Sequence, residues 1–261
     1  NRFARDLPTG AALGWLTAGW GDLWTRPAQS LIYGVAVGVL SALVIGGLVL
    51  AGMPWLIFPA LSGFLVIGPL LAIGVYEKSR RLRSTDPATL AQMLLVRPAS
   101  GGQLVFAGLL SCLLVMLWLR AADLIYALFF GMLPFPGFDR ILAQLLTTPR
   151  GWALILTGSA IGGLFAAFAM AISLFSIPML LERRVDALTA LGTSFAITTQ
   201  NLRAVLPWGA IVTLGFALSA AASFGLVGPG AGLHAWTAGA FGTVTLAVMS
   251  RASLGHTGRP L

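Results

Sequence analysis

The stretch GQLVFAGLLSCLLVMLWLRAADLIYALFFG, residues 102–131, decides the fold class of this chain. A helix needs about 20 predominantly apolar residues to cross the hydrocarbon core of a bilayer, and this stretch exceeds that length. It nevertheless contains two charged residues of opposite sign, Arg120 and Asp123, three positions apart. The stretch therefore predicts a membrane-spanning helix, and the charged pair inside it needs an explanation of its own.

The composition of the whole chain agrees with a lipid environment. Of the 261 residues, 57% are hydrophobic and only 9% are charged, whereas soluble domains carry about 25% charged residues. So few polar residues cannot cover a water-facing surface of this size. The net charge of +8 alone would be compatible with nucleic acid. Because the basic residues lie between apolar blocks, we assign them to the bilayer surface and expect no nucleic-acid partner.

Five further apolar blocks resemble the first in length. The six predicted spans cover residues 28–52, 54–76, 102–131, 151–181, 207–227 and 230–250. Backbone polar groups inside a bilayer must be bonded within the segment, so these blocks predict helices. The expected fold is an all-α membrane protein with six transmembrane helices in a single domain.

Lysine and arginine are distributed unevenly between the connecting segments. If the N-terminus lies inside, 13 of the 16 basic residues fall in inner segments, and the outer segments hold only Arg140 and Arg150. Cytoplasmic loops carry such an excess of positive charge. We therefore predict a multi-pass protein of the bacterial inner membrane with both termini in the cytoplasm. The chain starts at Asn1 and not at Met, so we expect residues to precede it.

Short amphipathic stretches precede three of the spans. They cover residues 10–25, 86–97 and 186–205, with Asp86 as the expected N-cap of the second. Apolar residues at helical spacing on one face predict helices lying in the cytoplasmic interface. The pattern suggests three repeats of an interfacial helix, a proline and two spans. The alternative, that any multi-span protein needs basic connectors of this kind, stays open.

Several stretches carry a resemblance to a known family. GWGDLWTRPAQSLIYG (19–34), LRAADLIYALFFG (119–131) and FSIPMLLERRVDALTALGTSFAITTQN (175–201) resemble the bacterial family called domain of unknown function 2189. The likeness extends over nearly the whole chain. It implies a polytopic inner-membrane protein, and the family has no established activity.

Some members of that family carry the name cytochrome c oxidase subunit I, and the histidine count of this chain contradicts that name. Haem iron needs axial side-chain ligands, most often histidine, and a copper centre needs several more. The chain has two histidines, His234 in the last predicted span and His256 in the tail. We therefore expect no haem, copper or other metal cofactor.

Arg120, Asp123 and Tyr126 form the candidate polar site. Positions three apart share a helix face, so the three side chains should line up. An ion pair within a span reduces the cost of a charge in lipid. Arg120 lies 18 residues beyond Gly102, about 27 Å along a helix and close to the outer edge of the core. The alternatives are a structural ion pair, a substrate or ion pathway, and contact with a partner subunit. Tyr126 is expected to bond to the pair or to anchor at the headgroups.

Other features indicate packing and not chemistry. The spacing of small residues in YGVAVG (33–38) and GSAIG (158–162) permits close helix contacts. Pro59, Pro69 and Pro178 are expected to kink their spans, with a broken helix at a binding site as the functional alternative. Asp22 and Asn201 are expected to bond to backbone groups at the entrances of spans.

The motifs of common enzymes do not occur in the sequence. It contains no GxSxG, HExxH, Walker loop, dinucleotide-binding glycine run or Cys/His cluster. Its only cysteine is Cys112, which excludes an intrachain disulfide. We predict a non-enzymatic protein, an accessory subunit or assembly partner of a larger membrane complex such as a respiratory one. Its partners would be the lipid bilayer and other membrane subunits. The alternative is a small-solute or anion transporter or channel that uses Arg120 and Asp123.

Overall fold

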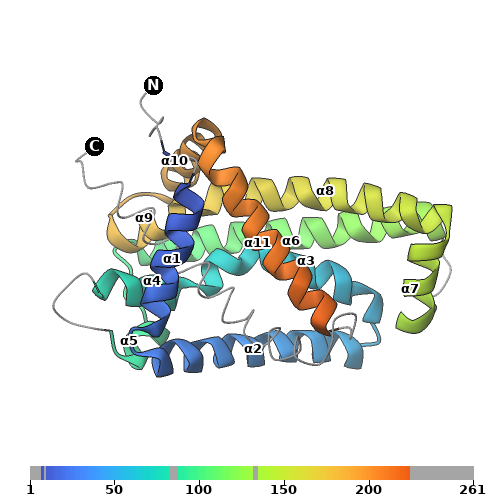
Figure 1. The fold of residues 1–261 in the computed structure, drawn as a ribbon, viewed down its shortest axis with the longest axis horizontal. Helices are drawn as coiled ribbons and strands as arrows, with labels where there is room; N and C mark the ends of the chain where they lie inside the picture. Colours follow the sequence, from blue (N-terminus) through green and yellow to red (C-terminus); the bar gives the residue numbers. More distant parts are fainter. Residues whose placement is uncertain (1–6, 9, 83–87, 132–134, 224–261) are drawn as a thin grey trace. The chain divides into compact units, whose positions relative to one another are not determined.

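The computed structural model describes residues 7–8, 10–82, 88–131 and 135–223. All regular secondary structure in this part of the chain is helical. Figure 1 shows the elements in order along the chain. The helices are α1 (Ala11–Trp24), α2 (Pro27–Leu50), the 3₁₀ turn η1 (Pro54–Leu56), α3 (Ile57–Leu71), α4 (Ile73–Arg81), α5 (Leu90–Leu94), α6 (Gly101–Phe130), α7 (Phe138–Thr147), α8 (Pro149–Ser173), α9 (Ser176–Glu182), α10 (Ala187–Gln200) and α11 (Leu202–Ser223).

Three helices of the described chain are long and apolar enough to cross a membrane. They are Pro27–Leu50, Gly101–Phe130 and the combined segment Pro149–Glu182, which joins α8 to α9. These agree with the predicted spans 28–52, 102–131 and 151–181. The first is the least covered by protein, since only 6% of its most apolar window is buried. An apolar helix left this open is suited to lipid contact.

The other three predicted spans do not each correspond to one described helix with the predicted bounds. The block 54–76 is no single helix, because it divides into η1, α3 and α4. The block 207–227 lies largely in α11, which begins earlier, at Leu202, and runs through Pro207. The block 230–250 lies outside the described residues, together with His234 and His256. Six spans in three repeats therefore remain a prediction.

Helices occur within the three stretches predicted as interfacial helices, with shifted bounds. The stretches 10–25 and 186–205 correspond to α1 and α10, and α10 begins where the Asp186 carboxylate accepts the Thr189 N–H at 2.8 Å. The stretch 86–97 contains only the short α5, whose N-cap is Thr89. Asp86 lies outside the described residues. Helix α5 therefore starts later than predicted, where Thr89 and Gln92 supply a complete capping box.

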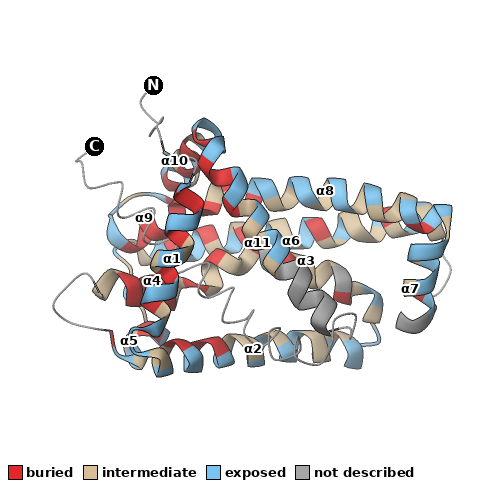
Figure 2. Cartoon of the chain, in the orientation of Figure 1, coloured by how far each residue is buried: buried red, intermediate tan, exposed pale blue. Residues whose placement is uncertain are grey.

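The chain divides into two compact units, each described by itself. The first consists of the described parts of Asn1–Leu40, Gly68–Gly108 and Ala171–Leu261, and the second of Ser41–Ile67 and Leu109–Met170. In the first unit α4 packs against α5 and α9, and α10 packs against α9. Figure 2 shows buried residues concentrated on α1, α4, α9 and α10. The first unit therefore contains a packed core built largely from short helices.

In the second unit, a tryptophan of α6 contacts two neighbouring helices. Trp118 of α6 donates its indole N–H to the Pro59 carbonyl at 3.0 Å and to Ser62 Oγ at 2.8 Å, both on α3. Its ring packs against Phe165 of α8 with centroids 5.6 Å apart. Gly162 lies below that ring, where an added Cβ would come within 2.8 Å of it. The GSAIG stretch thus serves internal packing at Gly162, and the carbonyl at Pro59 is bonded by a neighbouring helix.

Candidate functional site

Arg120 and Asp123 meet on one face of α6, as their spacing predicts. The Arg120 Nη1 atom lies 3.6 Å from the Asp123 Oδ2 atom. The pair is not buried, because the side chain of Arg120 is 83% exposed and that of Asp123 is 34% exposed. Leu117, Leu124 and Leu128 of the same helix are also exposed. The pair therefore lies on an outward, otherwise leucine-rich face of α6.

Tyr126 contacts another aromatic side chain of its own helix, and its anchoring at the headgroups stays a prediction. Its ring stacks on that of Phe130, with centroids 5.3 Å apart and planes 18° from parallel. Among the described contacts, no hydrogen bond joins its hydroxyl to Arg120 or Asp123. The three residues thus share a helix, but only two of them interact.

A second group of charges lies in α4, where sequence reasoning placed only a basic connector. Glu77, Lys78 and Ser79 are each at most 2% exposed. The charged form of a buried side chain is costly unless it is paired and hydrogen-bonded. Each of these three side chains should therefore have polar partners, and the structure supplies them.

Lys78 joins the end of α1 to the start of α2. Its Nζ atom donates to the Asp22 carbonyl at 2.9 Å and to Ser30 Oγ at 2.6 Å. The carbonyls of Leu23 and Arg26 lie 3.5 Å from it. The last carbonyls of a helix have no partner within it and carry a partial negative charge. The ammonium group therefore caps α1 from another helix.

Burial affects the proton affinity of this lysine. Desolvation lowers the pKa of Lys78 from 10.5 to about 8, and the negative charge of Asp22 opposes the shift. Asp22 is also buried, and its carboxylate accepts a hydrogen bond from Ser79 Oγ at 2.8 Å. The expectation that Asp22 bonds freed backbone groups stays a prediction, since the contact described for its carboxylate is with a side chain.

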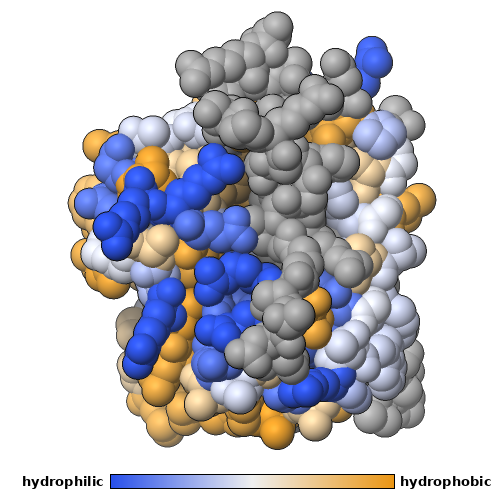
Figure 3. Space-filling model, turned by 90° about the vertical axis from the view of Figure 1, so that its left-hand side faces the viewer, coloured by the Kyte–Doolittle hydropathy of each residue, from blue (hydrophilic) through white to orange (hydrophobic). Residues whose placement is uncertain are grey.

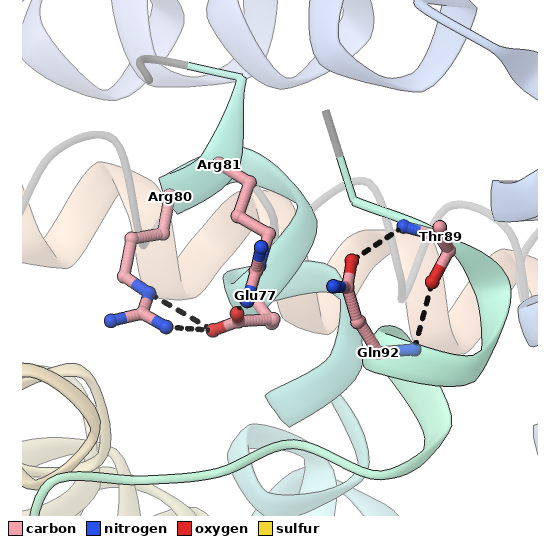
Figure 4. Close-up of polar contacts among 5 residues, drawn as sticks. All are labelled: Glu77, Arg80, Arg81, Thr89 and Gln92. Carbon is pink, nitrogen blue, oxygen red and sulfur yellow. Dashed lines mark hydrogen bonds and ion pairs between the residues drawn. The ribbon is translucent and has the colours of Figure 1, made fainter. Parts of the chain in front are cut away.

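Glu77 forms ion pairs with two arginines of its own helix (Figure 4). Its carboxylate lies 2.6 Å from Arg80 Nη2 and 2.6 Å from Arg81 Nε. The spacings of three and four residues are those at which helix side chains meet. Glu77 thus neutralises part of the basic charge in the last turn of α4. Figure 3 shows hydrophilic side chains gathered on the face of the molecule that it displays.

Hydroxyl groups fill two breaks between consecutive helices. At the α3–α4 break, Tyr33 OH donates to the Leu71 carbonyl at 2.9 Å and accepts the Gly74 N–H at 3.2 Å. A side chain inserted into the backbone ladder in this way interrupts a helix. This insertion explains why the predicted span 54–76 is not continuous.

The break between α8 and α9 has the same construction. Ser194 Oγ donates to the Ala171 carbonyl at 2.8 Å and accepts the Phe175 N–H at 3.0 Å. Pro178 adds a second cause, because it has no N–H to offer the carbonyl four residues earlier. Asn201, by contrast, bonds within its own turn, donating to the Ile197 carbonyl at 2.7 Å.

The arrangement of these groups is suited to holding helices together. Lys78 and Ser79 of α4 are buried and hydrogen-bonded to Asp22 of α1, which is also buried. These three side chains therefore do not face an open surface. Among the residues that the structure describes, no three His, Cys, Asp or Glu side chains are grouped to hold a metal ion. The sequence could have indicated the Glu77 pairs from their spacing. It could not have indicated that α1 ends beside Lys78.

Comparison with protein families gives one match. The model of a family described as "Predicted integral membrane protein (DUF2189)" matches residues 56–182, just under half of the chain. Over this region the chain is similar to the DUF2189 family. The match confirms the resemblance for LRAADLIYALFFG, whereas the stretch 19–34 lies outside it and the stretch 175–201 extends past its end. Comparison with curated proteins and with solved structures gives no match.

The DUF2189 match and the apolar helices together identify an integral membrane protein. The region includes α6, with Arg120 and Asp123, and α4, with Lys78. The charged residues of α4 and α6 therefore lie in the matched region, whereas Asp22 lies outside it. The family's description assigns no activity to either.

Proposed function

We propose that this protein is a non-enzymatic accessory subunit or assembly partner of a larger membrane complex, inserted in the bacterial inner membrane with both termini in the cytoplasm. The observation that carries the proposal is the exposure of Arg120 on α6. A charge in a span ordinarily faces the protein interior or a water-filled cavity. An arginine that points away from its own chain, among exposed leucines, is suited to a polar group on another membrane subunit.

The distribution of polar groups disfavours a pathway through the chain. Within Pro27–Leu50 there is no charged residue, and within Gly101–Phe130 the charged residues are Arg120 and Asp123 alone. Transporters place several polar or charged groups near the bilayer midplane at broken helices. The two breaks described here have their backbone groups bonded by Tyr33 and Ser194, which leaves those groups unavailable to a substrate.

The proposed architecture keeps six spans in three repeats. It is supported by the similarity of the α3–α4 and α8–α9 breaks. The helix after each break, α4 or α9, leads to a glutamate and a pair of arginines. In α4 these are Glu77, Arg80 and Arg81. The corresponding residues are Glu182, which ends α9, and Arg183 and Arg184 directly after it. Two similar breaks followed by similar charges are expected of a duplicated unit.

The test is native purification in mild detergent, comparing the unmodified chain with the double variant Arg120→Gln, Asp123→Asn. We expect a membrane protein that co-migrates in constant ratio with the unmodified chain to be lost from the double variant. Arg150→Gln is the matched control, because Arg150 is an exposed arginine at the start of α8. A partner retained by the double variant, or an unmodified chain that migrates alone, would contradict the proposal.

The second candidate is an anion transporter or channel that uses Arg120. It is favoured by the 3.6 Å separation from Asp123, which leaves most guanidinium donors open to a ligand. In that case small anions should raise the unfolding temperature of the unmodified protein, and Arg120→Gln should abolish the rise. If no anion raises it, this candidate loses its support.

A further inference from the structure

Three exposed arginines lie at the junction of two loops of the first unit. Arg97 belongs to the loop between α5 and α6, and Arg183 and Arg184 belong to the loop between α9 and α10. The two loops are 86 residues apart in the chain if counted from Arg97 to Arg183. Their proximity is therefore a property of the fold and cannot be read from the sequence.

Hydrogen bonds connect the two loops directly. The N–H groups of Ala99 and Ser100 donate to the carbonyls of Leu181 and Leu180 at 3.0 and 3.1 Å. Ser100 Oγ donates to the Arg183 carbonyl at 2.8 Å and accepts the Val185 N–H at 3.0 Å. These bonds fix the backbone on either side of Arg183 and Arg184 and shortly after Arg97, so the three side chains extend from an ordered backbone.

The junction lies at the ends of two candidate spans. Gly101–Phe130 begins four residues after Arg97, and Pro149–Glu182 ends immediately before Arg183. Residues that flank a span lie at the level of the lipid headgroups. Leu94, Leu95 and Leu188, which flank the arginines in sequence, are all exposed. Guanidinium groups beside exposed leucines match a lipid, whose phosphate adjoins its acyl chains.

The neighbouring acids leave the junction positively charged. Glu182 and Asp186 flank Arg183 and Arg184 in the chain, so three cations accompany two acids. The carboxylate of Asp186 accepts the Thr189 N–H at 2.8 Å, and hydrogen bonds from Thr189 hold the pKa of Asp186 below its ordinary value. That carboxylate is thus committed to capping α10, while the guanidinium groups are exposed.

We infer that Arg97, Arg183 and Arg184 bind the phosphate headgroup of an anionic phospholipid. Arginine pairs with phosphate through two parallel hydrogen bonds, which lysine cannot reproduce. Zwitterionic lipids carry a compensating cation and should bind weakly. The inference is independent of the partner subunit proposed above, because it concerns other residues and needs the chain alone.

The experiment uses the full chain in neutral detergent micelles doped with phosphatidylglycerol, with phosphatidylcholine as the zwitterionic comparison. The readouts are lipid retention in native mass spectrometry and the lipid-dependent rise in unfolding temperature. We expect the apparent affinity for phosphatidylglycerol to fall about 100-fold in the triple variant R97Q, R183Q, R184Q, at about tenfold or less per arginine. The matched control is R140Q with R150Q, which removes two exposed arginines elsewhere and should retain affinity.

Two further variants keep the inference falsifiable if the triple variant fails to fold. The triple lysine variant preserves the charge and should keep part of the affinity, and R184Q alone should lower it severalfold. Equal lipid binding by the glutamine and unmodified chains would overturn the inference, as would an equal loss in the R140Q, R150Q control. Competition by inorganic phosphate at the same concentration as the lipid would overturn it too, because it would show a phosphate site and not a lipid site.

Discussion

Lys78 and Arg120 are cations in helices of the same chain, yet their surroundings are opposite. Lys78 is 1% exposed and its ammonium group has four oxygen neighbours from other parts of the chain. Arg120 is 83% exposed and has one loose contact with Asp123 on its own helix. A buried cation with several oxygen partners stabilises the fold. An exposed cation with one distant partner is available to bind a group outside the chain.

The comparison predicts where substitutions will matter most for stability. Replacing Lys78 by alanine should have the largest effect, about 3 kcal/mol in the free energy of unfolding, because a cavity forms and the α1 carbonyls lose their cap. Lys78→Met is the matched variant, since it keeps most of the volume and removes only the ammonium group. Thermal unfolding in detergent should rank the chains as unmodified, methionine, alanine. Equal stability of all three would show that the cap is dispensable.

Substitutions at the two helix breaks should cause the second-largest loss of stability. Tyr33→Phe and Ser194→Ala each leave a buried backbone N–H and carbonyl without the hydroxyl between them, which should cost about 2 kcal/mol. The loss should be smaller for Ser194→Ala, because Thr198 Oγ1 already lies 3.4 Å from the Ala171 carbonyl. Chemical denaturation measures both, with Thr17→Val, at an exposed hydroxyl of α1, as the control. A loss no larger than that of the control would mean that water replaces the hydroxyl.

These breaks also show how far the sequence can lead. The bounds of α2 and α6 were predictable to within about two residues, because an apolar block of that length determines its own helix. The division of 54–76 was not predictable, since it depends on a tyrosine some 40 positions earlier. The Arg120–Asp123 contact followed from helical spacing. The burial of Lys78 did not, because it depends on where α1 ends in space. Helix α7 was missed as well, although its apolar residues recur at helical spacing.

Lys78 should also introduce a pH dependence. Its pKa in the folded chain, about 8, is below the ordinary value of 10.5, so between these values the unfolded chain binds more protons. The free energy of unfolding should then rise with pH from about 8 to 10.5 through this group. Unfolding measured across that range should show a steeper rise for the unmodified chain than for Lys78→Met. Parallel curves would indicate that the ammonium is not desolvated in the folded protein.

Arg120 should give the smallest effect, and that is what makes it informative. Exposed ion pairs contribute about 0–1 kcal/mol, so Arg120→Gln in the isolated chain should change the free energy of unfolding by about 0.5 kcal/mol or less. Asp123→Asn should do the same. A destabilisation comparable with that of Lys78→Ala would mean that the pair is structural after all, and the accessory-subunit proposal would lose its main support. If stability is unchanged while a co-migrating subunit is lost, the charge on α6 acts between chains, as its exposure indicates.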